Sequence, residues 1–231
     1  MTSPTHSLPP TSRPLFDGLF FLAVFGVLGA VVRIVFFTPY ELAQGAAQKI
    51  YYIHVAAALS AYLALAVVAT TSIVFLWLRD ARADRLAESA GEVALLCTTV
   101  VLTTGPFWGK PIWGTWWTWD ARLTLTLFLW FIMASYLVLR GAIDEPMMRA
   151  RYSSVLGILA ALLIPFIHLS VYMFRTLHPD PIVLKPDRPS LPPEMLLTFV
   201  ISVLAFLFFC FMLVRARYRL ALLRELAEEA T

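Results

Sequence analysis

The chain has 231 residues, of which 60% are hydrophobic and 14% charged, and its mean hydropathy is +0.77. This balance lies far from that of a soluble protein, so the composition excludes an ordinary soluble globular domain and predicts an integral membrane protein. The net charge of +3 is explained by the topology described below and gives no evidence for nucleic-acid binding.

The predicted elements are six membrane-spanning helices, which makes the fold class all-α and polytopic. Residues 1–14 are rich in proline and are predicted to form a disordered cytoplasmic arm. Apolar stretches long enough to span, about 20 residues each, make up a membrane domain over 15–214, in the ranges 15–37, 51–78, 93–107, 123–139, 155–174 and 195–214. The remaining residues, 215–231, alternate arginine with leucine, as an amphipathic cytoplasmic tail would.

The basic residues predict the orientation of these spans. Eleven of them fall on the side of the two termini and six on the opposite side, while Arg33 lies within the first span. Because lysine and arginine gather on the cytoplasmic side, both termini are predicted to be cytoplasmic and the loop after the third span to face outward. Arg33 is either functional or a side chain that extends to the interface.

Motifs of common enzymes are missing from the sequence. Cys97 and Cys210 both lie in predicted spans, and there is no CxxC, CxxCH, glycine-rich phosphate loop, GxSxG or HExxH sequence. The chain is therefore expected to be a binding protein without catalytic residues.

A tryptophan-rich segment, 108–124, follows the third span. Five of the seven tryptophans lie between Trp108 and Trp119. If the segment is helical, Trp113, Trp116, Trp117 and Asp120 share one face, which we call the aromatic shelf. Such a shelf is typical either of a membrane-interface belt or of a platform on which a large flat ligand stacks.

Two of the four histidines are predicted to lie at the outer face beside this segment. His54 begins the second span and His178 follows the fifth, whereas His6 lies in the N-terminal arm. Haem would use all these parts, since its iron binds neutral imidazole, its faces stack on indoles, and its propionates need cations. The outer-side candidates for the propionates are Lys110, Arg122 and Arg175. The spacing alone leaves haem binding and interfacial anchoring both open.

His168 is a separate case within the fifth span. It lies about 10 Å below the outer boundary at 1.5 Å per residue, three residues after Pro165. An ionisable group inside the membrane is a functional candidate. The alternative is a neutral imidazole that bonds a backbone carbonyl freed by the proline or lines the floor of a pocket.

The sequence also resembles a known family. The runs Trp108-Gly-Lys-Pro111 and Trp113-Gly-Thr-Trp-Trp-Thr-Trp-Asp-Ala-Arg-Leu-Thr124 are similar to the WWD signature of the haem-handling membrane proteins of cytochrome c maturation. Together with Tyr52-Ile-His54-Val and Thr176-Leu-His178, the six spans and the length resemble the smallest group of that family, CcmC.

The resemblance implies specific roles. It implies that His54 and His178 are the two axial ligands of the iron of haem b, and that the binding domain is formed by Trp113, Trp116, Trp117, Trp119, Asp120 and Arg122. It also implies a bacterial inner-membrane protein whose binding loops face the periplasm or the cell exterior. The implied partners are the haem chaperone CcmE, the small protein CcmD, and the ABC transporter formed by CcmA and CcmB.

The resulting prediction is a protein that binds haem at the outer face and delivers it to CcmE. One alternative is the larger haem-attachment synthase of the same family, which has more spans and an extra outer domain. Another is a haem-b electron carrier in a quinone-linked complex, which requires histidine pairs within the bilayer. The third is a structural membrane subunit without a cofactor.

Overall fold

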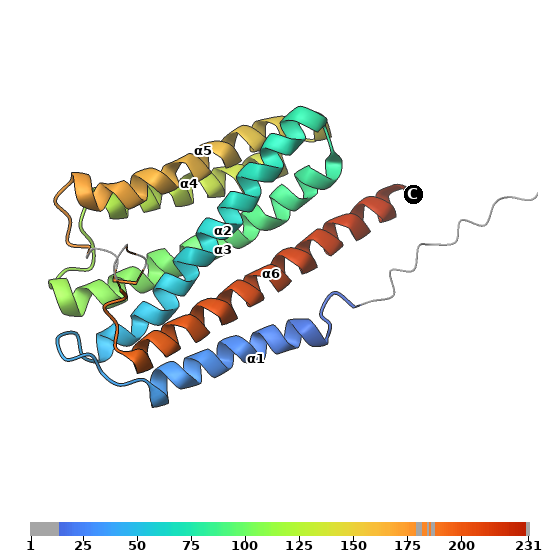
Figure 1. Cartoon of the computed structure of the whole chain (residues 1–231). Helices are drawn as coiled ribbons and strands as arrows, with labels where there is room; N and C mark the ends of the chain where they lie inside the picture. The colour runs from blue at the N-terminus through green and yellow to red at the C-terminus, as the bar shows by residue number, and fades with distance from the viewer. Residues whose placement is uncertain (1–13, 179–181, 184, 186–187, 230–231) are drawn as a thin grey trace, which may run out of the picture.

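The computed structural model of the protein describes residues 14–178, 182–183, 185 and 188–229, and these form an all-helical bundle (Figure 1). Most of the predicted arm, 1–13, lies outside the described residues. The elements in chain order are α1 (Gly18–Val32), a π-helical continuation (Arg33–Phe37), a 3-10 turn (Ala46–Gln48), α2 (Lys49–Leu78), α3 (Ala81–Trp113), α4 (Ala121–Ala142), α5 (Pro146–Met173) and α6 (Pro193–Glu229).

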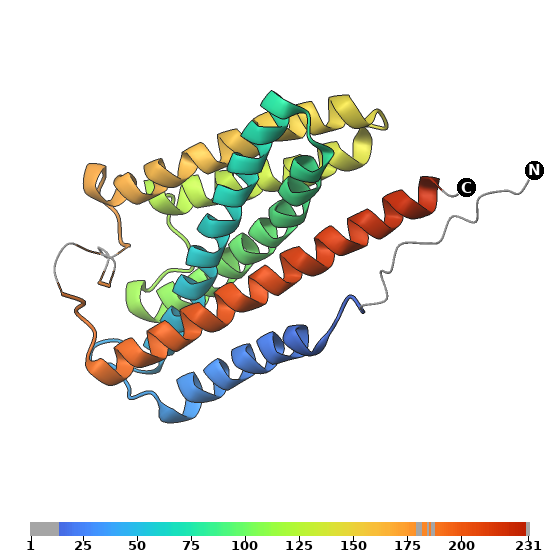
Figure 2. The same cartoon turned by 45° about the vertical axis from the view of Figure 1, so that its right-hand side comes forward.

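The prediction of an all-α polytopic membrane protein is confirmed. Six helical segments are long and apolar enough to cross a membrane. Helices α2 and α3 cross in the middle of the bundle, with the pair α1 and α6 on one side and the pair α4 and α5 on the other (Figures 1 and 2). A two-residue turn joins α2 to α3, which makes them antiparallel neighbours over their full length.

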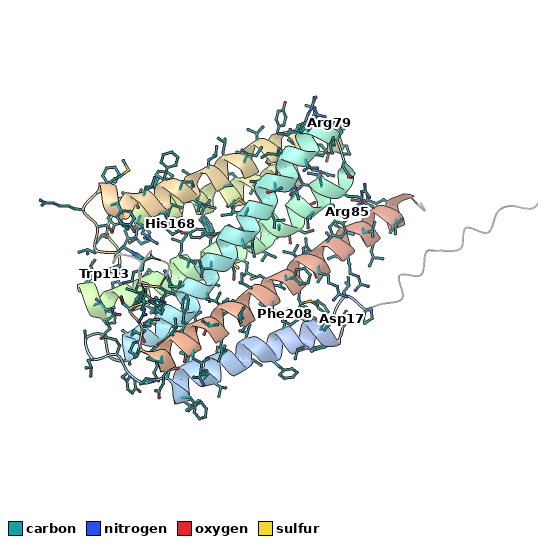
Figure 3. The ribbon with its side chains drawn as sticks, viewed as in Figure 1. Asp17, Arg79, Arg85, Trp113, His168 and Phe208 are labelled. Carbon is teal, nitrogen blue, oxygen red and sulfur yellow. The ribbon has the colours of Figure 1, made fainter. Side chains whose placement is uncertain are left out.

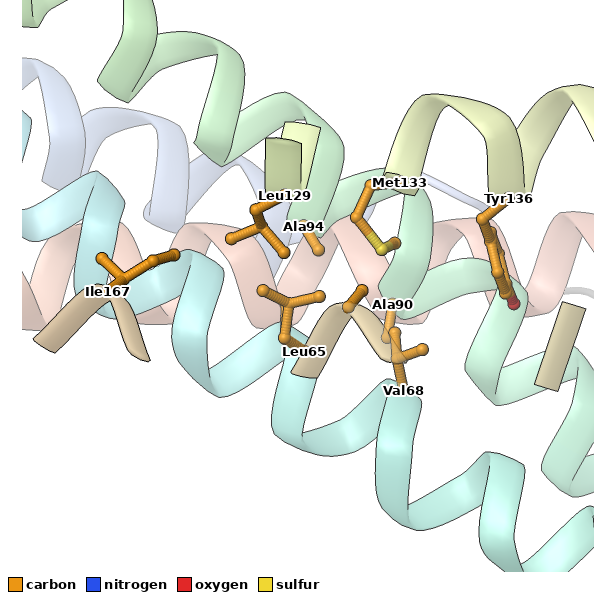
Figure 4. Packing of buried hydrophobic residues seen from close by; sticks show 10 residues of the cluster. Leu65, Val68, Ala90, Ala94, Leu129, Met133, Tyr136 and Ile167 are labelled. Carbon is orange, nitrogen blue, oxygen red and sulfur yellow. The ribbon is translucent and has the colours of Figure 1, made fainter. Parts of the chain in front are cut away.

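The buried core lies where α2, α3, α4 and α5 meet (Figure 4). Leu65 and Val68 of α2 pack there against Leu129 and Met133 of α4. Small residues of α3 and α5 let the helices approach closely, as is usual in membrane proteins. The other buried members of this cluster are Ala64, Ala90, Ala94, Tyr136, Ala160 and Ile167.

Ion pairs hold the end of the bundle that carries both ends of the described chain. Asp17 caps the N-terminus of α1 and pairs with Arg215 of α6 at 2.6 Å. The hydrogen bond from the Arg215 guanidinium holds the pKa of the Asp17 carboxyl below its ordinary value. Arg140 of α4, with 4% of its side chain exposed, pairs with Asp84 and Glu88 of α3. Which side of the membrane this end faces stays a prediction.

Several helices are longer than the predicted spans because they continue past the apolar residues into charged segments. The range 93–107 is only the apolar part of α3, which begins twelve positions earlier at Ala81 and carries acidic residues through its first turns. Likewise α6 continues without a break from the predicted span 195–214 through the tail to Glu229. Charged side chains are compatible with these extensions because they pair with one another, as Arg217 does with Glu92.

The helical conformation predicted for the aromatic shelf is wrong. Helix α3 ends at Trp113, and its C-cap, Gly114, has a φ of +75°, a left-handed conformation that favours glycine. The chain then stays non-helical until Asp120, which caps the N-terminus of α4. Trp113, Trp116, Trp117 and Asp120 therefore do not share a helical face.

Candidate functional site

A cavity lies at the end of the bundle opposite the ion pairs. Figure 3 shows Trp113 at this end, far from Asp17 and Arg85. The cavity is lined by His54, Ala58, Ala61, Tyr62, Thr98, Val101, Leu102, Gly105, Pro106, Trp108, Trp113, Trp116, Trp117, Arg122, Leu123, Thr126, Leu129 and His178.

His54 reaches the cavity from the second turn of α2. Its Nδ1 lies 2.9 Å from the hydroxyl oxygen of Thr104 on α3. The Trp108 ring, one turn further along α3, meets the imidazole edge-on with the ring centroids 5.6 Å apart. The imidazole is thus oriented by α3, although it belongs to α2.

His178 reaches the same cavity from the segment after α5. Its backbone N–H donates to the Thr176 hydroxyl at 3.1 Å, and its ring centroid lies 6.4 Å from that of Trp113. The structure therefore brings together His54 and His178, as the sequence predicted, and places both at the wall of one cavity.

Three of the four predicted binding tryptophans line the cavity. Trp113, Trp116 and Trp117 do so, whereas Trp119 is 76% exposed and contacts the edge of the Trp117 ring. Trp116 also packs edge-on against Phe107. Trp113 ends α3, whereas Trp116 and Trp117 belong to the loop that follows, so the indoles that line the cavity do not form one helical face.

Two nitrogen atoms at the cavity are buried without a hydrogen-bond acceptor among the described residues. They are Nη1 of Arg122 and Nε1 of Trp117. A buried unpaired donor costs about 1–3 kcal/mol, so both atoms favour a ligand with acceptor oxygens. Of the three predicted propionate contacts, only Arg122 lines the cavity. Lys110 donates to the Gly114 carbonyl at 2.8 Å, and Arg175 is exposed.

Asp120 is close to the cavity but does not line it. Its Oδ1 accepts from the Leu123 N–H at 3.0 Å, and its Oδ2 accepts from the Thr118 hydroxyl at 3.1 Å. A second hydroxyl, that of Thr115, donates to the Trp117 carbonyl at 3.0 Å. Asp120 thus begins α4 and closes the tryptophan loop, and the threonines hold that loop in place.

The sequence left the roles of His168 and Arg33 open, and the structure shows what each of them contacts. His168 is not among the cavity-lining residues, but its ring lies 5.3 Å from that of Tyr62, which is. It therefore lies behind the cavity wall. Arg33 donates through Nε to the Thr198 hydroxyl of α6 at 3.1 Å, so its side chain bonds to a neighbouring helix.

The sequence did not single out Tyr62 and Gly105, which line the cavity, or Thr104, whose hydroxyl lies beside His54. Tyr62 lies two turns below His54 on α2, at the same face, and its helical spacing from His54 is the one signal that could have found it. Thr104 and Gly105 are far from His54 in the chain and are brought beside it only by the packing of α3 on α2. No local pattern marks them.

The residues that line this cavity suit an apolar ligand that carries an anionic group and its own metal. Its walls offer two imidazoles, several indoles, aliphatic side chains and one guanidinium. Within the described part of the chain, no group of three or more histidine, cysteine or acidic side chains could hold a bare metal ion. Two imidazoles can instead serve as axial ligands to an iron that arrives in a macrocycle.

Comparison with known proteins gives a consistent result. The family described as heme exporter protein C (CcmC) matches residues 2–231. Heme exporter protein C of Haemophilus influenzae is 34% identical over 192 residues, which cover 82% of this chain and 77% of the relative. The Escherichia coli K12 protein of the same name is 33% identical over 180 residues, covering 73% of this chain and 72% of the relative.

A relative from a plant is similar to the same extent. A ccmC-like mitochondrial protein of Marchantia polymorpha, whose name refers to cytochrome c biosynthesis, is 34% identical over 179 residues. These cover 78% of this chain and 75% of the plant protein.

Proposed function

Since the chain belongs to the heme exporter protein C family, we propose that it binds haem b in the cavity at the outer face of the membrane and delivers it to the haem chaperone CcmE. In this proposal His54 and His178 are the axial ligands of the iron. Trp113, Trp116 and Trp117 enclose the macrocycle, and Arg122 binds a propionate. Haem is cargo here, and the protein makes or breaks no covalent bond in it.

The observation that carries the proposal is the convergence of two imidazoles and an unpaired cationic donor on one cavity. His54, His178 and Arg122 come from three segments that are distant in the chain, yet all line it. Arg122 Nη1 is buried without an acceptor among the described residues, which a propionate oxygen would supply. A charge-assisted hydrogen bond of this kind contributes about 1.5–3 kcal/mol.

The tryptophan loop supports the step of delivery. Trp116 and Trp119 are 54% and 76% exposed, beside a cavity whose lower wall is buried in the bundle. If His54 of α2 binds the iron, one edge of the haem would lie near the exposed indoles of Trp116 and Trp119. An acceptor protein could reach the haem at that edge. We place this face at the periplasmic side of the bacterial inner membrane, on the basic-residue distribution, with CcmD, CcmA and CcmB as further partners.

The test is the optical spectrum of the protein purified in mild detergent, with and without added haem. We expect low-spin haem with split α and β bands on reduction. His54→Ala and His178→Ala should each lower the haem retained and change its spin state, because each removes a metal bond. Added imidazole should restore part of the low-spin signal.

The matched control is His168→Ala, which changes a histidine outside the cavity lining and should have a smaller spectral effect. Low-spin haem lost in His168→Ala but kept in His54→Ala would overturn the proposal and favour an electron carrier with haem inside the bilayer. A wild-type protein that takes up no haem would favour the structural subunit.

A further inference from the structure

Thr104 makes a hydrogen bond to the imidazole of His54 that limits which ring nitrogen can bind a metal. Its hydroxyl oxygen lies 2.9 Å from His54 Nδ1 and 2.7 Å from the backbone carbonyl of Val100. A hydroxyl has one hydrogen to donate and lone pairs to accept. The single Thr104 hydrogen must therefore go either to the Val100 carbonyl or to Nδ1.

Only one of these two arrangements satisfies every group. If Thr104 donated to Nδ1, two oxygen atoms would face each other at 2.7 Å with no hydrogen between them. If Thr104 donates to the Val100 carbonyl, its oxygen is left to accept from Nδ1–H, and the chain of donors and acceptors is complete. The second arrangement leaves Nε2 as the nitrogen with a free lone pair.

The packing of α3 keeps the ring in this position. A Cβ placed on Gly105 would lie 3.4 Å from His54 Cε1, so the α3 backbone passes directly beside the imidazole. The Trp108 ring contacts the imidazole edge-on, with the ring centroids 5.6 Å apart. Thr104, Gly105 and Trp108 thus restrict rotation of a ring that belongs to another helix.

We propose that Thr104 is a positioning residue that holds His54 as the Nδ1–H tautomer and directs Nε2 to the haem iron. The proposal rests on the proposed function, and it names how the site prepares one of its ligands. A metal-bound histidine commonly donates its other N–H to a fixed acceptor, which orients the ring and makes the ligating nitrogen a stronger donor. A stronger donor stabilises ferric haem and lowers its reduction potential.

The test compares Thr104→Val, which removes the hydroxyl at nearly constant shape, with Thr104→Ser, which keeps it. The matched control is Thr103→Val, since Thr103 is the preceding residue of α3, is exposed, makes the same kind of bond to a backbone carbonyl and does not line the cavity. Haem affinity and the midpoint potential of bound haem are measured on the full-length protein in detergent.

We expect Thr104→Val to weaken haem binding about tenfold and to raise the midpoint potential. Thr104→Ser should keep both values near those of the wild type, and Thr103→Val should change neither. Equal affinity and potential in Thr104→Val and Thr103→Val would overturn the proposal while leaving haem binding intact.

A second measurement needs neither haem nor a variant at Thr104. In the haem-free wild-type protein labelled with nitrogen-15 histidine, the signal assigned to His54 through His54→Ala should show the proton on Nδ1. A proton on Nε2 would overturn the proposal even if the protein binds haem. Failure to bind haem, with the proton on Nδ1, would instead contradict the proposed function alone.

Discussion

At the scale of single residues, the charged side chains near the cavity divide by what they contact. Asp120 accepts from the first turn of α4 and from Thr118, and Lys110 donates to the carbonyl of Gly114. Of the three predicted propionate contacts only Arg122 lines the cavity, and its Nη1 has no hydrogen-bond partner among the described residues. Asp120 and Lys110 thus bond at the ends of helices, whereas Arg122 is the residue that we propose binds the ligand.

Replacing Asp120 separates its capping role from its charge. Asp120→Ala removes the N-cap acceptor of α4, so we expect the free energy of unfolding to fall by about 1 kcal/mol and haem retention to fall with it as the loop loosens. Asp120→Asn keeps an oxygen that can accept from the Leu123 N–H and should lose less than half as much. Thermal unfolding in detergent, followed by circular dichroism, gives the comparison. Equal losses of stability in both variants would contradict the capping role, because the asparagine keeps the acceptor oxygen.

At the scale of elements, α3 organises the site, since it supplies the partners of His54 and ends in the tryptophan loop. Its packing on α2 and α4 depends on residues without a side chain where the helices cross. The Tyr136 ring of α4 lies so close to Gly91 of α3 that a Cβ there would be 2.8 Å from it. On α5, a Cβ at Gly157 would lie 2.6 Å from Val68 Cγ1 and 3.2 Å from Ser72 Oγ.

Gly157→Ala should therefore destabilise the contact between α2 and α5. We expect a loss of about 1–3 kcal/mol in the free energy of unfolding, because the added methyl group overpacks the helix crossing. The control is Gly141→Ala in α4, where nothing lies within 4 Å of the added Cβ. There the better helix propensity of alanine should leave stability unchanged or raise it by up to about 1 kcal/mol. A melting temperature of Gly157→Ala at or above that of Gly141→Ala would contradict this account.

At the scale of the whole molecule, the bundle has buried ion pairs at one end and the cavity at the other. Arg140 joins α4 to α3 through Asp84 and Glu88, and donates to Ser153 of α5 at 3.1 Å. Arg85 joins α3 to Glu225 and Tyr218 of α6 in the same region. These contacts join α3 to α4, α5 and α6 at the end of the bundle away from the cavity.

Arg140→Met tests this division. The change leaves two carboxylates without their buried partner, so we expect a loss of about 3–5 kcal/mol in the free energy of unfolding. Arg82→Met is the control, since Arg82 is 79% exposed in its pair with Asp80 and such a pair contributes below about 1 kcal/mol. Thermal unfolding in the same detergent gives both values. Similar melting temperatures for the two variants would show that the buried cluster does not hold this end together.

Much of the architecture could be predicted from the sequence because it depends on local composition. A run of about 20 apolar residues is helical in a bilayer whatever its neighbours are, since the backbone must satisfy its own hydrogen bonds. The six spans and the class of fold follow from that requirement. The WWD run and the histidines after Tyr52-Ile and Thr176-Leu were recognised as the signature of a family that the comparison confirmed.

Only the tertiary structure decided how those residues are used. Local spacing favoured a helical shelf, but α3 ends at Gly114 and α4 begins at Asp120, so Trp116 and Trp117 line the cavity from the loop between them. The choice of Arg122 over Lys110 and Arg175, the place of His168 behind Tyr62, and the bond from His54 to Thr104 each join segments far apart in the chain. Such contacts arise from the packing of whole helices, which no pattern of three or four residues records.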